Sequence, residues 1–219
     1  VVVLDDADLE ATVKVAVRSR FGNAGQTCIA AKRFIVTAGI ADRFVQAFAD
    51  AASKLVVGDP NDDASSLAPM ARADLRDELH RQVEASLAAG AKAALGCAPG
   101  AGDTHYPASI LDQVRPGMPA YDQELFGPVA SILRAKDEAG AVAMANDTAF
   151  GLGASVWTQD RDRGEAVARK IVAGACFVNA IVRSDVRLPF GGTKASGFGR
   201  ELAEHGMHEF TNIQTVYVA

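Results

Sequence analysis

The amino-acid sequence predicts an α/β fold in which helices cover both faces of a doubly wound, mostly parallel sheet. Three observations lead to this prediction. Short apolar runs that suit strands alternate with longer segments whose apolar residues recur at helical spacing. Turn signals rich in glycine, proline and aspartate separate them. Strands joined by helical crossovers pair in parallel, and 219 residues suffice for one domain with its own core.

The chain opens on an apolar run, residues 1–4, which predicts a buried strand. Asp6 is expected to cap a helix that ends near residue 20, with Leu9, Val13 and Val17 on its inner stripe. The sequence does not begin with methionine and starts inside this predicted strand. We therefore expect a fragment or an excised domain of a longer protein.

The remaining elements follow in the same alternation. Strands are expected where short apolar runs end at turn residues, at 33–37, 55–57, 92–95, 108–111, 129–133, 153–157 and 175–179. Helices are expected where apolar residues recur on one face, at 40–54, 71–89, 137–145 and 161–173. The chain ends with a glycine-rich loop, a short helix near 200–204 and a strand-like segment at 213–218. No helix follows this last segment, which is a candidate for pairing outside the domain.

Composition and charge argue against several classes of function. A net charge of −5 without a run of lysine and arginine argues against nucleic-acid binding. No apolar stretch is long enough to span a bilayer, and there is no signal-peptide pattern at the start. Three widely spaced cysteines, Cys28, Cys97 and Cys176, fit a reducing cytoplasmic compartment better than a disulfide framework. The four histidines share no ligand spacing with cysteine or carboxylates, so no metal site is expected.

Cys28 is the strongest candidate for chemistry. It ends the octet Phe-Gly-Asn-Ala-Gly-Gln-Thr-Cys, and residues 29–32 are predicted to form a short helix after it. Unpaired N–H groups at such a helix start would favour the nucleophilic thiolate. The alternative is a small apolar core residue, the interpretation that also suits Cys176. Cys97 lies in a loop rich in glycine and proline and is expected to be an incidental thiol.

Two further pairs of residues attract attention. Glu124 lies two positions before Phe126, and a carboxylate close to an aromatic ring could contribute to a ligand site. The alternative is a surface glutamate beside a core phenylalanine. Arg183 beside Ser184 could hold a substrate carboxylate through charge-assisted hydrogen bonds. The alternative is a solvated loop in which Arg183 pairs with Asp185.

The octet that ends at Cys28 resembles the active-site signature of the aldehyde dehydrogenase superfamily. Other segments resemble the same family in the same order, and the resemblance covers essentially the whole chain. They are Leu-Asp-Asp-Ala-Asp-Leu at 4–9, Glu-Leu-Phe-Gly-Pro-Val at 124–129, Asn-Asp-Thr at 146–148, Phe-Gly-Leu-Gly at 150–153 and Pro-Phe-Gly-Gly at 189–192, with Lys194 and Ser196-Gly197 after it. Residues 30–34 and 208–216 are most similar to the succinate-semialdehyde dehydrogenase branch.

The resemblance implies a role for each of these residues. It implies that Cys28 attacks the substrate carbonyl, that Glu124 binds the nicotinamide ribose and that Phe126 packs near the nicotinamide of NAD or NADP. It also implies that Ser184 contacts a substrate carboxylate and that Phe190 lines the substrate tunnel. One position departs from the pattern. Some enzymes of this branch have arginine where this chain has Gly22, so carboxylate recognition would depend on other residues.

The resemblance further implies a domain organisation. Residues 1–206, with a glycine-rich loop at 187–199, would form the catalytic domain, and 207–219 a strand that joins a neighbouring subunit in a homo-oligomer, a dimer or tetramer. The dinucleotide-binding domain, the general base and the oxyanion asparagine of the family would lie upstream, so this chain alone is expected to be inactive. Two alternatives remain open: a semialdehyde dehydrogenase that passes its thioester to coenzyme A, and a folded oligomerising module without turnover.

Overall fold

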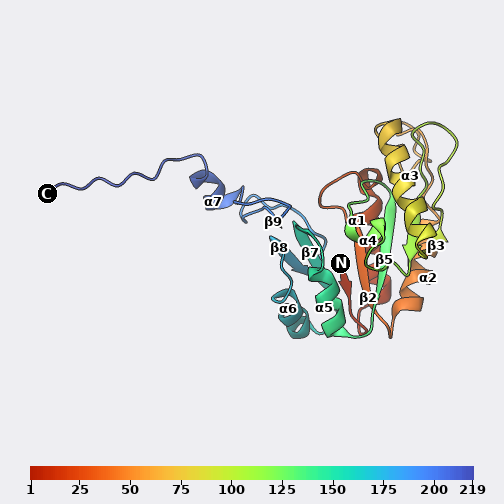
Figure 1. The fold of residues 1–219 in the computed structure, drawn as a ribbon, viewed down its shortest axis with the longest axis horizontal. Helices are drawn as coiled ribbons and strands as arrows, with labels where there is room; N and C mark the ends of the chain where they lie inside the picture. Colours follow the sequence, from red (N-terminus) through yellow and green to blue (C-terminus); the bar gives the residue numbers. More distant parts are fainter.

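The computed structural model describes all 219 residues and places seven strands in one sheet (Figure 1). The order across the sheet is β3-β4-β5-β2-β1-β7-β8. The strands are β1 (Val2–Val3), β2 (Arg33–Thr37), β3 (Lys92–Leu95), β4 (Ser109–Asp112), β5 (Val129–Ala135), β7 (Gly153–Trp157) and β8 (Ala175–Val178). Every neighbouring pair is parallel except β3 with β4, which runs antiparallel. The prediction of a mostly parallel sheet is therefore confirmed.

Helices cover both faces of this sheet, as predicted. The helices α1 (Leu9–Phe21) and α2 (Ala41–Ala52) contribute to one hydrophobic cluster. The other cluster contains residues of α3 (Ala73–Ala88), α4 (Pro119–Asp122), α5 (Glu138–Asn146) and α6 (Arg161–Ala168). Strand β2 contributes side chains to both clusters, because successive residues of a strand point to opposite faces: Phe34 and Val36 belong to the first cluster and Ile35 to the second.

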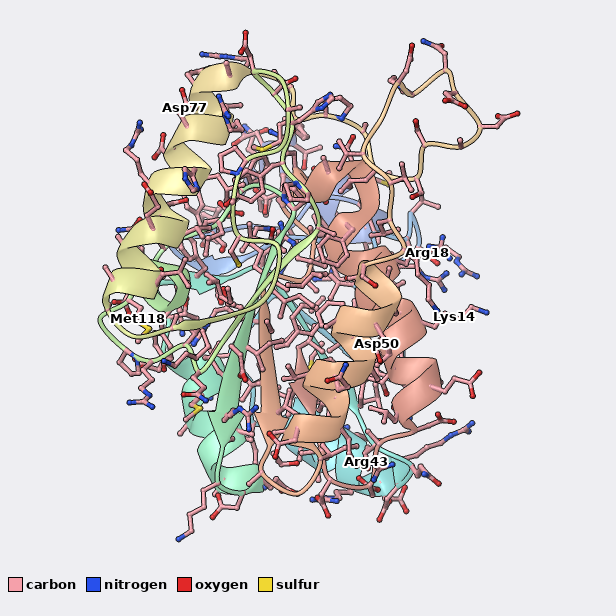
Figure 2. All side chains as sticks on the ribbon, turned by 90° about the vertical axis from the view of Figure 1, so that its right-hand side faces the viewer. Lys14, Arg18, Arg43, Asp50, Asp77 and Met118 are labelled. Atoms are coloured by element: carbon pink, nitrogen blue, oxygen red, sulfur yellow. The ribbon has the colours of Figure 1, made fainter.

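Aromatic rings fill the space between β2 and the helix pair α1 and α2. Phe48 lies 5.8 Å from Phe21, 5.0 Å from Phe34 and 5.5 Å from Phe44, measured between ring centroids. Phe44, Phe48 and Ala52 are fully buried, which confirms the predicted inner face of the second helix. The outward faces of these helices carry charged side chains (Figure 2). The apolar face of each helix therefore packs on the sheet, and its charged face points to solvent.

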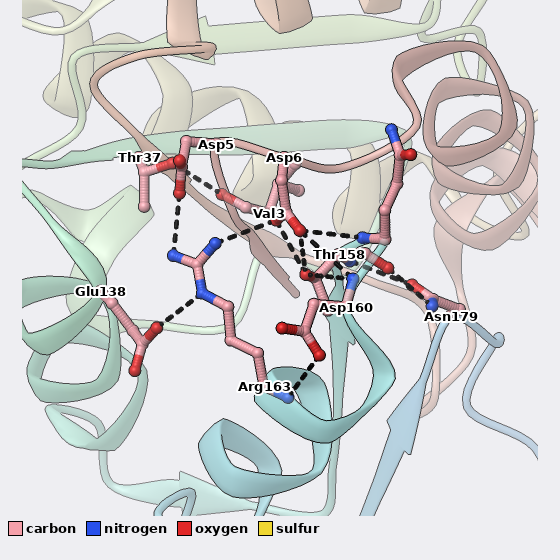
Figure 3. Close-up of polar contacts among 10 residues, drawn as sticks. Val3, Asp5, Asp6, Thr37, Glu138, Thr158, Asp160, Arg163 and Asn179 are labelled. Carbon is pink, nitrogen blue, oxygen red and sulfur yellow. Dashed lines mark hydrogen bonds and ion pairs between the residues drawn. The ribbon is translucent and has the colours of Figure 1, made fainter.

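Asp6 does not cap α1, contrary to the prediction. Asp8 is the N-cap, and its carboxylate accepts a hydrogen bond from the Ala11 amide. Asp6 instead accepts the Thr158 hydroxyl at 2.7 Å and pairs with Arg163 at 3.1 Å (Figure 3). Arg163 also pairs with Asp5 and Glu138. This ionic cluster joins the carboxyl ends of β1 and β7 to α5 and α6.

Other elements differ in extent from the prediction. Residues 55–57 form no strand, because Val57 makes only a single bridge to Leu67 and has no neighbouring strand to extend it. α6 ends at Ala168, five residues before its predicted end, since residues 169–173 turn toward β8. The short last helix is α7 (Ala203–His208). A two-stranded sheet of β6 (Phe150–Gly151) and β9 (Thr193–Lys194) was not predicted.

The C-terminal segment extends away from the body of the protein (Figure 1). Its apolar side chains are exposed, among them Phe210 at 95% and Ile213 at 88%. Residues 213–218 form no strand within this chain, and their pairing with another subunit stays a prediction. None of the helices combines the length and apolar character that crossing a membrane would require.

Arg20, at the end of α1, joins two loops behind the sheet. Its guanidinium is fully buried and donates hydrogen bonds to the carbonyl oxygens of Gly25 and Ala31 in one loop and of Leu125 and Gly127 in the other. Burial lowers the pKa of Arg20, and its partners are backbone carbonyls. A Cβ atom on Gly25 would collide with the guanidinium and with the Gly127 carbonyl, so the glycine is needed for this close approach.

We predict that Arg20→Met destabilises the fold by about 3 kcal/mol or more, because it leaves several buried carbonyls without donors. The matched control is Arg18→Met on the same helix. Arg18 is exposed and makes no side-chain hydrogen bond, so its loss should change the free energy of unfolding by less than about 0.5 kcal/mol. Urea unfolding of both variants measures the difference. Equal small losses would show that Arg20 does not hold the two loops.

Candidate active site

A cavity of about 380 Å³ opens at the amino ends of β1, β2 and β7. The turn that carries Cys28 forms one wall, and the segment 120–125 forms another. The start of β7 and the β6–β9 pair close the remaining sides, where the Gly151 amide donates a hydrogen bond to the Ser196 hydroxyl at 3.0 Å. Most of the lining residues are hydrophobic. The shape suits a small molecule held among apolar side chains with a few polar groups.

Cys28 lies in this wall, but not at a helix start. Residues 27–30 form a turn and a bend, and residues 31–32 lead directly into β2. The predicted short helix at 29–32 is wrong. The Lys32 ammonium donates hydrogen bonds to the carbonyls of Thr27, Cys28 and Ala30, which a helix would have used for its backbone hydrogen bonds. The thiol is nevertheless exposed and free. The predicted helix start at Cys28 is therefore absent, and the residue is an exposed thiol on a turn four residues before Lys32.

The backbone before Cys28 is held in an unusual conformation. Asn23, Ala24 and Gly25 all have positive φ angles, of 53°, 52° and 69°. Asparagine and glycine tolerate this region, whereas alanine adopts it only under constraint from its surroundings. Arg20 supplies part of that constraint by holding the Gly25 carbonyl at 3.0 Å. The loop that presents Cys28 is thus fixed by tertiary contacts.

Lys32 is the residue that the sequence analysis missed. Its Nζ donates to the carbonyl oxygens of Thr27 at 3.0 Å and of Cys28 and Ala30 at 3.2 Å. It also pairs with the Glu124 carboxylate at 3.0 Å, and its side chain is only 15% exposed. Burial lowers the pKa of Lys32, and Arg20 adds to the effect, while Glu124 and Cys28 oppose it. In the sequence, the only sign of this role was the position of Lys32, four residues after Cys28.

Glu124 lines the same cavity as Cys28, and Phe126 lies next to Lys32. Glu124 lines the cavity and keeps 39% of its side chain exposed. Phe126 is not among the lining residues, but its ring centroid is 5.6 Å from the Lys32 ammonium and the residue is 39% exposed. The interpretation of Phe126 as a core side chain does not hold. Lys32 is the common neighbour of all three predicted residues.

Arg183, Ser184 and Phe190 are not brought into the cavity. Arg183 and Ser184 are exposed, while the adjacent Val182 is buried and lines the cavity. Asp185 pairs with Arg187 at 2.7 Å, and not with Arg183 as the alternative interpretation expected. Phe190 is half-buried and exchanges two backbone hydrogen bonds of 2.8 Å with Glu201. The loop therefore begins at the cavity wall and leads its polar residues away from it.

The floor of the cavity contains an arginine stacked on a tyrosine. Arg33 lies 4.5 Å from the Tyr121 ring centroid and donates to the Met144 carbonyl at 2.9 Å. The Tyr121 hydroxyl donates to Asp147 at 2.7 Å, and burial together with that hydrogen bond raises the pKa of Tyr121 to about 12. Both groups are engaged with protein partners. They therefore line the cavity with side chains that already have partners.

The other two cysteines lie elsewhere. Cys97 is buried, contrary to the expectation of an exposed loop thiol, because its chain segment packs against β4 and the Ser109 hydroxyl accepts its amide at 2.9 Å. Burial raises the pKa of Cys97 and of Cys176, each to about 11. No group of three or more histidine, cysteine or acidic residues is placed to hold a metal ion.

Comparison with known proteins connects this site to a family. The model of the aldehyde dehydrogenase family matches residues 1–216. A succinate semialdehyde dehydrogenase (NAD(P)+) of Escherichia coli K12 is 51% identical over 217 residues, which are 99% of this chain and 47% of that protein. A probable succinate-semialdehyde dehydrogenase (NADP(+)) of Synechocystis is 46% identical over 222 residues, 100% of this chain and 48% of that protein.

Solved structures agree with these relatives. The succinic semialdehyde dehydrogenase of Streptococcus pyogenes in complex with NADP+ superposes with a TM-score of 0.94 at 37% identity, covering 99% of this chain and 48% of that one. An NAD-dependent aldehyde dehydrogenase of Sinorhizobium meliloti gives a TM-score of 0.94 at 35% identity, covering 99% and 43%. This chain spans about half the length of the curated relatives it matches. It belongs to the aldehyde dehydrogenase family.

Proposed function

We propose that this chain carries the nucleophile of an NAD(P)-dependent aldehyde dehydrogenase that oxidises a small semialdehyde, succinate semialdehyde, to its acid. One observation supports this most directly. The exposed thiol of Cys28 and the carboxylate of Glu124 line one cavity, with the ring of Phe126 beside it. The names of the relatives, which include both NAD(P)+ and NADP(+) enzymes, support the cofactor and the substrate class.

The chemistry at Cys28 follows from the properties of a thiolate. Its sulfur forms a bond to the aldehyde carbon, and the carbonyl oxygen takes the electron pair of the broken π bond. When bound, NAD or NADP supplies the hydride acceptor that converts this thiohemiacetal to a thioester. Water then breaks the carbon–sulfur bond, which releases the acid and returns the thiol. The Cys28 backbone amide is a candidate donor to the oxyanion.

Glu124 and Phe126 have the chemistry to hold the nicotinamide end of the cofactor. A carboxylate accepts hydrogen bonds from two ribose hydroxyls, and an aromatic face packs on a planar ring. Glu124 keeps part of its side chain exposed toward the cavity although Lys32 pairs with it. Phe126 is similarly accessible. These two side chains would therefore orient the cofactor against Cys28.

The substrate and assembly assignments depend on segments outside the cavity. We infer that Arg183 and Ser184 hold the distal carboxylate of the substrate and that Phe190 lines its path. Their loop is anchored by Val182, which already lies in the cavity wall. We also infer that 1–206 is the catalytic domain and that 207–219 mediates homo-oligomerisation. The exposed apolar side chains of that segment support the second inference.

Cys28 should react with iodoacetamide faster than the other two cysteines at neutral pH. Cys97 is buried, and Cys97 and Cys176 both have pKa values raised to about 11 by burial, so each carries little thiolate. A short pulse of reagent followed by peptide mapping measures the three rates in one sample. Faster labelling of Cys97 or Cys176 in the folded protein would contradict the assignment of Cys28 as the nucleophile.

Cys28→Ala should abolish aldehyde oxidation in the protein of full natural length, because no other thiol reaches the cavity in reactive form. Reduced-cofactor absorbance with succinate semialdehyde measures the rate, and product analysis distinguishes acid from acyl-CoA when coenzyme A is added. Cys97→Ala is the matched control and should retain activity. Turnover by the Cys28 variant would refute the mechanism, and acyl-CoA as the main product would replace hydrolysis with thiol transfer.

Replacing both Arg183 and Ser184 by alanine should lower kcat/KM for succinate semialdehyde roughly tenfold or more, because a charge-assisted hydrogen bond contributes about 1.5–3 kcal/mol. The value of kcat/KM for butanal, which lacks the carboxylate, should fall only slightly. Arg187→Ala in the same loop is the control, since Arg187 pairs with Asp185. Equal losses on both aldehydes would mean that the loop shapes the tunnel only. No loss on either would place carboxylate recognition elsewhere.

A further inference from the structure

Lys32 is a buried cation whose contacts all lie in the candidate site. Its ammonium has three protons and four oxygen acceptors between 3.0 and 3.2 Å. Three of them are carbonyls of the turn that presents Cys28. The fourth is the carboxylate of Glu124. Lys32 therefore connects the turn that carries the proposed nucleophile with the carboxylate proposed to bind the cofactor.

Arg20 and Lys32 are cations buried near the cavity, and they bind different groups. Arg20 holds backbone carbonyls of both loops and touches no functional side chain. Lys32 holds the turn at the Cys28 carbonyl and holds Glu124 directly at its carboxylate. The Phe126 ring, 5.6 Å away, lies on the same ammonium. Removing the charge of Lys32 would release Glu124 while Arg20 still joined the loops.

The charged and titratable groups that face Lys32 are Arg20 from α1, Glu124 from the segment before β5, and Cys28 from its own turn. Burial and Arg20 disfavour its charged form, and Glu124 and Cys28 favour it. The ammonium therefore loses its proton at a lower pH than an ordinary lysine, whose pKa is about 10.4. Below that point the contacts are intact, and above it the ion pair to Glu124 is lost.

We propose that Lys32 is a positioning residue that holds the Cys28 turn and the Glu124 carboxylate in one fixed relation while it is protonated. The proposal builds on the proposed function, since it assigns to Lys32 the alignment of nucleophile and cofactor-binding carboxylate. Lys32 touches neither reacting atom. Its effect is exerted through Cys28 and Glu124, and it should be strongest on steps that need both.

The first test compares Lys32→Met and Lys32→Arg with Lys54→Met, an exposed lysine without an ion pair, in the protein of full natural length. Lys32→Met should lower kcat/KM for the dinucleotide about tenfold or more, and Lys32→Arg should restore most of it. The Lys54 variant should behave as the wild type. Melting temperatures measured in parallel identify a variant that has simply lost stability.

The pH profile separates positioning from a purely structural role. The wild type should lose kcat/KM for the dinucleotide on the alkaline side, below the ordinary lysine pKa, as Lys32 deprotonates. In Lys32→Arg this fall should move upward by at least about one pH unit or vanish, because a guanidinium stays charged. Arg20, Glu124 and Cys28 are unchanged in that variant. A fall that stays in place would therefore belong to one of them and would overturn the proposal.

A second readout does not depend on turnover. Iodoacetamide should label Cys28 several-fold more slowly in Lys32→Met than in wild type or Lys54→Met, because the turn that presents the thiol to the cavity loses its three hydrogen bonds from the ammonium. Lys32→Arg should label at close to the wild-type rate. This holds even if the aldehyde dehydrogenase assignment fails, which the wild-type activity assay would reveal separately. Unchanged labelling in folded Lys32→Met would overturn the role of Lys32.

Discussion

A guanidinium without a carboxylate partner holds the architecture of the site together. Arg20 is fully buried, and carbonyl oxygens from the loops that precede β2 and β5 surround it. The two terminal nitrogens of the guanidinium donate all of these hydrogen bonds, and the loss of the side chain would leave the buried carbonyls without donors. Both loops must therefore approach α1 together. The loop of Cys28 and the loop of Glu124 become neighbours as a consequence.

Because these two loops precede β2 and β5, the candidate site lies at the amino ends of the strands. Open α/β sheets usually bind ligands beyond the carboxyl ends. Here the carboxyl ends of β1 and β7 are occupied by the ionic cluster of Asp5, Asp6 and Arg163 (Figure 3). The opposite end carries the cavity, with Lys32 beneath the Cys28 turn. A closed polar cluster at one end fixes the strands, and an open cavity at the other leaves room for a ligand.

The sequence predicted the sheet and its helices well because burial on two faces leaves a strong pattern. β2 and β5 read as strands from their apolar runs, and α2 from Phe44 and Phe48 on one stripe. The motifs also predicted that Cys28, Glu124 and Phe126 belong to one site, and Cys28 and Glu124 line the same cavity. What failed was local. The segment 29–32 has residues that suit a helix, but the Lys32 ammonium donates hydrogen bonds to the Thr27 and Ala30 carbonyls of the turn instead.

The sequence by itself therefore determined the fold class and the family, because periodicity and motif are properties of the chain, and it singled out Cys28 as the candidate nucleophile. It predicted Asp6 as the cap of the first helix, whereas Asp6 in fact binds Thr158 and Arg163. Only the tertiary structure decided that Asp8 caps α1, that Cys97 is buried, and that Lys32 lies between Cys28 and Glu124. The reason is physical: hydrogen bonds and ion pairs join residues far apart in sequence, and local propensity carries no record of them.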